Sequence, residues 1–275
     1  MSSSASGRLP AELSPIARRF RERASEGRAA LIPYLTAGFP NPKLTVPTME
    51  ALADAGADVI ELGIPFSDPL ADGPTIQRSS FLALERGASV DSVLSALRDF
   101  RESREVPVVV FTYLNPVLHR GLDAFCREAA QAGAQGILLT DLPVGADPEM
   151  EEAVGGAGLD WIRLVAPTTP AERIPLVARG GTGFLYYISR TGVTGARARL
   201  RDDLAAELGA LRGMVTLPIA VGFGISTPEQ AHAVAAAADG VVVGSALISR
   251  LEQEGITGAA AFVRSLRDGM DGSHG

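Results

Sequence analysis

Residues 58–75, DVIELGIPFSDPLADGPT, combine an apolar run typical of a buried strand with a polar loop that contains two aspartates. Side chains alternate between the two faces of a strand, so Ile60 and Leu62 are expected on one face and Glu61 on the other. Glu61 therefore points away from the side chains that should pack against helices. A buried carboxylate costs free energy unless another group pairs with it or the protein uses it.

Glu61 alone has two interpretations, a carboxylate in a buried ion pair or at a strand end, and a catalytic acid. The loop that follows favours the second interpretation. Asp68 and Asp72 lie in a stretch rich in proline and glycine, and both are close enough in sequence to reach the same strand end as Glu61. Two acids at one site are what general acid–base catalysis requires.

Length and composition are those of a globular protein, with 275 residues, 46% hydrophobic content, 30 glycines and 18 prolines. This length suits two small domains or one α/β barrel. The net charge of −7 argues against a nucleic-acid-binding surface, which would be basic. The single Cys126 falls on the apolar face of a helical stretch and is expected in the core, and the three histidines fit no zinc spacing.

The two ends of the chain differ from the rest in composition. Residues 1–12 are rich in serine, and we expect them, like residues 269–275, to be disordered tails around one domain over 13–268. No apolar run reaches the roughly 18 residues that a membrane helix needs. The start also lacks the apolar stretch of a secretory signal, so we expect an intracellular, cytoplasmic protein.

Short apolar runs alternate with helical stretches after an amphipathic helix from Leu13 to Glu26. Strands that alternate with helices pair in parallel, and eight of them close a (β/α)8 TIM barrel, here with an extra N-terminal helix. An open doubly wound sheet is the alternative, but it normally has fewer repeats. The eight predicted strands are 30–38, 58–66, 106–114, 136–143, 159–167, 183–189, 217–224 and 239–246.

In such barrels the chemistry lies at the C-terminal ends of the strands. Two glycine-containing turns occupy that position, GFGIS at 222–226 after the seventh strand and Gly244-Ser245 after the eighth. Glycines let backbone N–H groups approach a phosphate, although they also serve tight turns. The two turns together favour a phosphorylated substrate.

Two further features lie near the strand ends. The sixth strand runs into SRTGVTGARARLRDD, residues 189–203, which is either a lid or a flexible connection. Four aromatic residues either fill the core or line a pocket for a flat apolar ligand. They are Tyr34, Tyr113, Tyr186 and Phe223.

The run LGIPFSDPLADGPTIQ, residues 62–77, closely resembles the signature of the tryptophan synthase alpha chain family. The resemblance extends over residues 13–268. Tyr34 stands where a Phe is often found and Phe39 replaces a commonly polar residue, but neither departure touches the acids. The other matching stretches, in family order, are PYLTAGFP (33–40), DLPV (141–144), SRTGVTG (189–195), VGFGIS (221–226) and VGSA (243–246).

The resemblance implies a lyase of tryptophan biosynthesis that cleaves indole-3-glycerol phosphate to indole and glyceraldehyde 3-phosphate. It assigns Glu61 the proton-shuttling role and Asp72 the acceptor of the indole N–H. A carboxylate in a dry barrel interior should have a raised pKa, whereas Asp72, on a more polar loop, should stay ionised. The implied substrate-binding residues are Gly195, Gly224, Gly244 and Ser245 for the phosphate, Tyr34, Tyr186 and Phe223 for the indole, and Thr194 in the lid.

The family works as a heterotetramer of two alpha and two beta chains, so the resemblance implies a beta-chain partner. Pyridoxal phosphate is expected in the beta chain, with no cofactor or metal in this one, and Asp68 should organise its loop or meet the partner. Two alternatives stay open, a stand-alone indole-3-glycerol phosphate lyase and a catalytically silent activator of a beta chain. Intact Glu61 and Asp72 argue against the silent activator.

Overall fold

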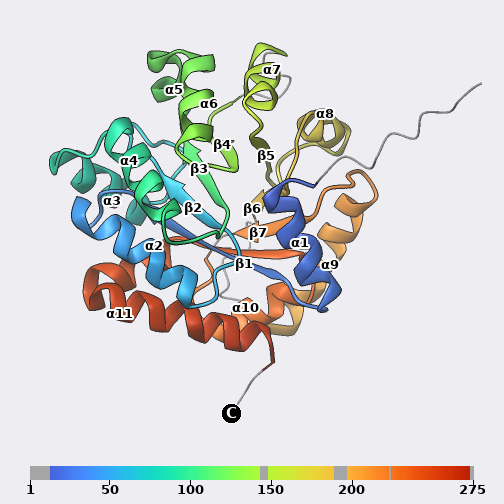
Figure 1. Cartoon of the computed structure of the whole chain (residues 1–275). Coiled ribbons are helices and arrows are strands. Elements are labelled where there is room, and N and C mark those ends of the chain that lie inside the picture. The colour runs from blue at the N-terminus through green and yellow to red at the C-terminus, as the bar shows by residue number, and fades with distance from the viewer. Residues whose placement is uncertain (1–12, 143–147, 189–196, 223, 273–275) are drawn as a thin grey trace, which may run out of the picture.

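Eight parallel strands close into a barrel in the computed structural model, which describes residues 13–142, 148–188, 197–222 and 224–272 (Figure 1). Each strand pairs with the next in sequence, and β8 pairs with β1. The predicted eight-stranded barrel is therefore confirmed. The strands are β1 (Ala30–Thr36), β2 (Ile60–Gly63), β3 (Val108–Thr112), β4 (Gly136–Leu139), β5 (Asp160–Val165), β6 (Leu185–Ile188), β7 (Ile219–Gly222) and β8 (Gly240–Val243).

Helices surround the barrel on its outer side (Figure 1). The extra N-terminal helix is present, and it begins at Pro15 rather than Leu13 because Ser14 caps it by accepting a hydrogen bond from the Ala17 N–H. The α-helices are α1 (Pro15–Ser25), α2 (Thr45–Asp54), α3 (Pro74–Glu85), α4 (Val90–Arg101), α5 (Leu114–Arg120), α6 (Leu122–Gln131), α7 (Pro148–Gly156), α8 (Ile174–Ala178), α9 (Arg197–Arg212), α10 (Pro228–Ala235) and α11 (Ser245–Met270). Two short 3-10 helices are η1 (Pro42–Leu44) and η2 (Ala171–Arg173).

The strands bury side chains on both faces, which explains why they are continuous apolar runs in the sequence. Ile60 and Leu62 belong to the core between the barrel and its helices, as the alternation predicts. The barrel interior holds a second, smaller cluster that includes Val59 and Val109. Glu61 lies on this inner face, so the fold places a carboxylate inside the barrel.

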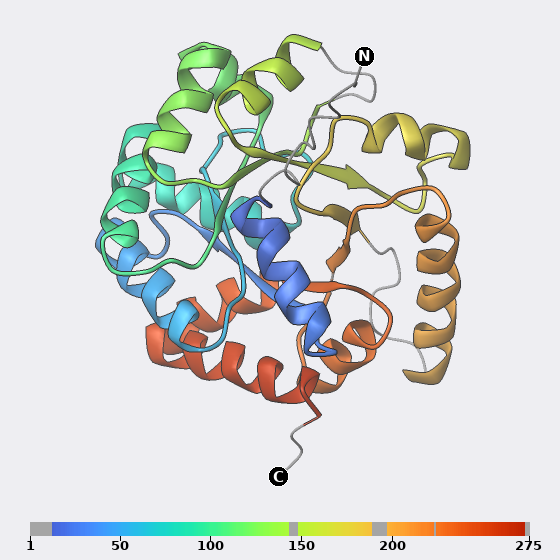
Figure 2. The same ribbon diagram turned by 45° about the vertical axis from the view of Figure 1, so that its right-hand side comes forward.

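Helix α1 covers one end of the barrel (Figure 2). Ile16 and Phe20 from α1 are buried with the inward-facing residues of the strands, and the Phe20 ring lies 5.2 Å from the Phe184 ring. The Ser14 hydroxyl, at the start of the helix, donates a hydrogen bond of 2.5 Å to Asp160, the first residue of β5. These contacts close the end at which the strands begin, so the opposite end is left for a ligand.

Several smaller predictions fall within the described residues. Cys126 is fully buried on the apolar face of α6, as expected. None of the helices that the structure describes is long and apolar enough to cross a membrane. The predicted tail at 1–12 and most of the predicted lid, residues 189–196, lie outside the described residues. Of the predicted C-terminal tail 269–275, residues 273–275 also lie outside them, but α11 continues to Met270, so the tail prediction began too early.

Candidate active site

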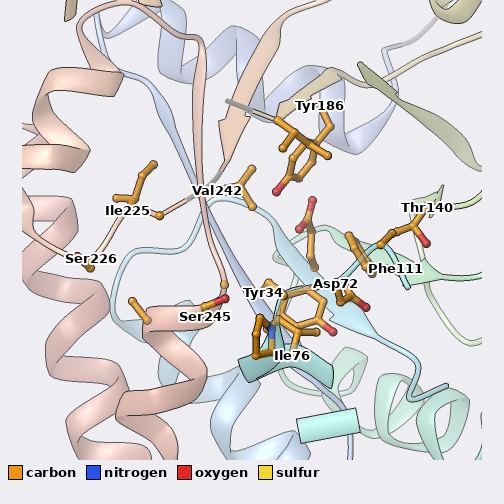
Figure 3. Close-up of a pocket in the computed structure, with 18 of the residues that line it drawn as sticks. Tyr34, Asp72, Ile76, Phe111, Thr140, Tyr186, Ile225, Ser226, Val242 and Ser245 are labelled. Carbon is orange, nitrogen blue, oxygen red and sulfur yellow. The ribbon is translucent and has the colours of Figure 1, made fainter. Parts of the chain in front are cut away.

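A cavity of about 490 Å³ lies at the end of the barrel where the strands finish (Figure 3). Tyr186 projects into it from one side, with Tyr34 and Asp72 across from it. The lining combines residues that follow β2, β4, β7 and β8, as the position of active sites in such barrels predicts. Of the residues predicted to form the site, the cavity brings together Tyr34, Glu61, Asp72, Tyr186, Gly224, Gly244 and Ser245.

Three predicted substrate-binding residues are not placed by the structure. Thr194, Gly195 and Phe223 lie outside the described residues, so their roles stay predictions.

Glu61 reaches the cavity from the middle of β2. Its side chain is buried, with 1% exposed surface, and neither carboxylate oxygen has a hydrogen-bond partner among the residues that the structure describes. Burial removes water from the carboxylate and raises the pKa of Glu61 from 4.5 to about 8. The group therefore carries a proton at neutral pH and is poised to donate it to a ligand in the cavity.

Asp72 lies in the loop between β2 and α3 and has a direct partner. The Tyr113 hydroxyl donates a hydrogen bond of 2.9 Å to its Oδ2 atom, and the same hydroxyl oxygen accepts one of 3.1 Å from the Ala71 N–H. Burial raises the pKa of Asp72 to about 6, although the hydrogen bond from Tyr113 acts in the opposite direction. At neutral pH Asp72 is thus mostly ionised, and the two acids of the site are in different protonation states.

Two glycines determine how the tyrosines of the cavity lie. A Cβ atom at Gly63 would come within 2.2 Å of the Tyr34 hydroxyl oxygen, and one at Gly222 within 2.2 Å of the Tyr186 hydroxyl oxygen. Gly63 on β2 pairs with Thr36 on β1, two residues after Tyr34. Gly222 on β7 likewise pairs with Ile188 on β6, two residues after Tyr186. The absence of a side chain at these glycines lets each ring lie across the neighbouring strand.

The side of the cavity near β8 has the character of an anion site. Gly244 is the N-cap of α11, which is kinked at Gly255, and Ser245 is its first residue. The N–H groups of a first helical turn have no partner within the helix, and the helix dipole favours a negative charge there. Gly224 enters the same cavity with a φ of 71°, a conformation that favours glycine. The arrangement suits a phosphate group.

Ser249 was not predicted from the sequence, whereas Tyr113 was offered as a pocket aromatic and Ser226 as part of the GFGIS turn. Ser226 and Ser249 line the cavity, and Tyr113 contacts Asp72. The contact of Tyr113 with Asp72 was not predicted. Ser249 lies one helical turn after Ser245, and this i, i+4 spacing could have indicated that it faces the same cavity.

Asp68 lies apart from this cavity. It is exposed, and one carboxylate oxygen accepts a hydrogen bond of 2.6 Å from the Ser67 hydroxyl. Within the described parts of the chain, no group of three or more His, Cys, Asp or Glu residues is arranged to hold a metal ion.

Comparison with known proteins gives one family. The family model for the tryptophan synthase alpha chain matches residues 20–269. The tryptophan synthase alpha chain of Geobacter sp. strain M21 is 47% identical over 262 residues, which cover 94% of this chain and 98% of that protein. The alpha chain of Synechococcus elongatus is 46% identical over 253 residues, covering 92% and 95% of the two chains.

Solved structures agree with the sequence relatives. The crystal structure of tryptophan synthase subunit alpha from Legionella pneumophila superposes with a TM-score of 0.88 at 38% identity, covering 95% of this chain and all of that one. A structure of tryptophan synthase from Mycobacterium tuberculosis gives a TM-score of 0.86 at 36% identity, with coverage of 94% and 99%. Because sequence and fold match over nearly the whole length, this chain belongs to the tryptophan synthase alpha chain family.

Proposed function

We propose that this chain cleaves indole-3-glycerol phosphate to indole and glyceraldehyde 3-phosphate, as the lyase subunit of a tryptophan synthase. The observation that carries the proposal is Glu61, a buried carboxyl group without a hydrogen-bond partner, which faces a cavity large enough for the substrate. Strongly shifted pKa values in a cavity are typical of catalytic acids and bases. The family's place in tryptophan biosynthesis supports a cytoplasmic enzyme.

The first step needs a proton on carbon C3 of the indole ring. Glu61 has a pKa of about 8 and so holds a proton at neutral pH, which it donates to C3. The resulting Glu61 carboxylate then accepts the proton of the substrate hydroxyl next to the bond that breaks. The C–C bond electrons return to the ring, the hydroxyl carbon becomes the aldehyde, and Glu61 ends the cycle protonated.

Protonation of C3 places positive charge on the indole ring, and Asp72 is placed to stabilise it. Its carboxylate is mostly ionised at neutral pH and is oriented by the hydrogen bond from Tyr113. It accepts the indole N–H, so a fixed negative group stabilises the positive charge that develops on the ring. Tyr113 is therefore a positioning residue for Asp72.

The remaining parts of the cavity hold the two ends of the substrate. Tyr34 and Tyr186 provide ring surfaces for the indole, and the lining also includes Phe111 and Leu164. The phosphate binds at the start of α11, where Gly244 and Ser245 lie. Thr194, Gly195 and Phe223 complete these contacts by resemblance to the family.

We also propose a beta-chain partner in an assembly of two alpha and two beta chains, with pyridoxal phosphate in the beta chain. Exposed apolar side chains near the cavity support a docking surface. Leu70, in the loop that carries Asp72, is 90% exposed, Phe81 on α3 is 60% exposed and Leu118 on α5 is 56% exposed. Apolar side chains this exposed often mark an interface.

The decisive experiment measures the release of indole from indole-3-glycerol phosphate by the purified chain, alone and with a tryptophan synthase beta chain. We expect turnover in both cases and faster turnover with the partner. A stand-alone lyase would show no complex by size-exclusion chromatography and no change in rate. A silent activator would release no indole in either case, which would refute the catalytic roles of Glu61 and Asp72.

A further inference from the structure

A second, smaller cavity of about 50 Å³ lies next to β4 and β5. Thr140 and Leu164 line both this cavity and the larger one, so the small cavity adjoins the wall of the proposed active site. Its lining includes one charged side chain, Arg163, together with Trp161 from the same strand and Val177 from α8.

Arg163 is buried, with 7% exposed surface, and lies on the face of β5 that is directed toward the helices. Its Nε atom donates a hydrogen bond of 2.8 Å to the Val177 carbonyl oxygen. The guanidinium group stacks on the Trp161 ring, with 4.1 Å between its central carbon and the ring centroid. Stacking and hydrogen bond together fix the plane of the guanidinium group.

The two terminal nitrogen atoms of Arg163 form no hydrogen bond or ion pair with the described residues, although an arginine has five N–H donors. The nearest carboxylate that affects it, Glu151 on α7, is exposed. Burial of the side chain lowers the pKa of Arg163. Its terminal nitrogen atoms are not among the fully enclosed polar atoms of the described residues that lack a partner, so they remain accessible to a small polar group in the cavity.

The chain around Arg163 is shaped to accommodate it. A Cβ atom at Gly181 would lie 2.6 Å from the Arg163 Cγ atom, so the glycine makes room for the arginine stem. The cavity that remains has room for about three or four water-sized groups, because roughly 10–15 Å³ of such volume holds one water. This is the size of an anion with three or four non-hydrogen atoms.

We propose that this cavity binds a small planar oxyanion, a carboxylate of the size of formate or acetate, through the terminal N–H groups of Arg163. A guanidinium group presents two parallel N–H donors at the spacing of two carboxylate oxygens, so the pair is bidentate. The bound anion neutralises the buried cation. It sits behind the wall that Thr140 and Leu164 share with the larger cavity, separate from the phosphate site at the start of α11.

Trp161 makes the proposal directly testable, because it is the only tryptophan in the chain and stacks on Arg163. Sodium formate is titrated into the full-length protein while Trp161 fluorescence is recorded. Sodium gluconate keeps the ionic strength constant, since its anion is too large for the cavity. We expect a saturable change in fluorescence for the unmodified protein.

Two variants separate this site from other anion sites. Arg163→Met keeps Trp161 and the apolar stem but removes the donors, so the saturable change should be lost. Arg104→Met, which removes an arginine paired with Asp54 on the surface, should retain it. The absence of a saturable change in the unmodified protein, or its persistence in Arg163→Met, would overturn the proposal.

A measurement on the unmodified protein tests the same anion site even if Arg163→Met does not fold. Crystals soaked in sodium formate should show a planar three-atom density feature within hydrogen-bond distance of the terminal nitrogens of Arg163. Density for separate water molecules alone at the same formate concentration would refute the site.

Discussion

At Glu61, a burial that is unfavourable for stability gives the side chain the raised pKa that catalysis needs. Both carboxylate oxygens are buried without a hydrogen-bond partner, and burial raises the pKa to about 8. The ordinary value of 4.5 would leave the group ionised and unable to donate a proton at neutral pH. The same water exclusion that disfavours the charged group therefore makes it a usable acid, and such conflicts are expected at functional sites.

Replacing Glu61 by Gln tests this role, because the amide keeps the shape of the side chain and cannot exchange a proton in the same way. We expect indole release to fall by about 10²–10⁴-fold, the usual contribution of one general acid–base group. Circular dichroism and substrate binding should be nearly unchanged. Glu85→Gln, the same change at an exposed position on α3, is the control and should keep full activity. More than a tenth of the activity in Glu61→Gln would remove this residue from the mechanism.

The two acids also predict a bell-shaped dependence of kcat/KM on pH. Asp72 must be ionised, so kcat/KM should rise with pH through about 6. Glu61 must be protonated in the free enzyme, so kcat/KM should fall as pH rises through about 8. Asp72→Asn should be poorly active, and its residual activity should lack the rising limb. A rising limb that is unchanged in this variant would assign it to another group.

The sequence predicts which face Glu61 occupies and that burial raises its pKa, but not how far the pKa rises. The period of two along β2 is local, and it is enough to place Glu61 opposite Ile60 and Leu62. The pKa depends on which groups approach the carboxylate from other strands, and this is a property of the closed barrel. For the same reason the hydrogen bond between Tyr113 and Asp72 was not predicted, since it joins the end of β3 to the loop after β2.

Among the elements, α11 has the clearest functional geometry, because its first turn faces the cavity. Gly244 precedes the helix with φ −116° and ψ −84°. A Cβ atom there would meet Tyr34 only at 3.7 Å, an ordinary contact distance. No described atom comes closer to that position, so the space in front of Gly244 is left for the ligand.

Gly244→Val should consequently bind substrate poorly. The added side chain occupies the space proposed for the phosphate, so KM should rise more than kcat falls, by about tenfold or more if one charge-assisted contact is lost. Gly209→Val, on an exposed face of α9 with no atom near its Cβ position, is the matched control. Loss of stability in Gly244→Val with an unaltered KM in the folded fraction would show that the glycine serves the turn instead.

The elements themselves were largely predictable. Eight apolar runs in the sequence correspond to the eight strands of the barrel, because a strand buried on both faces is apolar throughout. The close approach of the Tyr34 ring to Gly63 and of the Tyr186 ring to Gly222 was not predictable in the same way. Each pair depends on the register between neighbouring strands, which no local pattern in the sequence determines.

At the scale of the whole molecule, one end of the barrel is filled by a packed helix and the other end carries the cavity. Helix α1 fills the end where the strands begin, with Ile16 and Phe20 in the interior cluster (Figure 2). The other end carries the cavity (Figure 3). Stability and catalysis therefore depend on residues at opposite ends, as is general for barrels of this type.

The proposed partner should dock at the end that carries the cavity, because exposed apolar side chains lie on the loop that follows β2 there. Leu70 is the strongest candidate contact, since its side chain is 90% exposed and lies in the loop that also holds Asp72. Leu70→Glu places a charge where the interface would exclude water. We expect the Kd for a beta chain to rise by about tenfold or more, the effect of losing a central apolar contact.

Activity of the Leu70→Glu chain alone should stay close to that of the unmodified chain, because the Leu70 side chain does not line the cavity. The acceleration by a beta chain should then require higher concentrations of the partner. Leu176→Glu, at a 47% exposed leucine on α8, makes the same chemical change away from the β2–α3 loop and should leave the Kd unaltered. Equal Kd values for Leu70→Glu and the unmodified chain, measured by titration calorimetry, would place the docking surface elsewhere on the molecule.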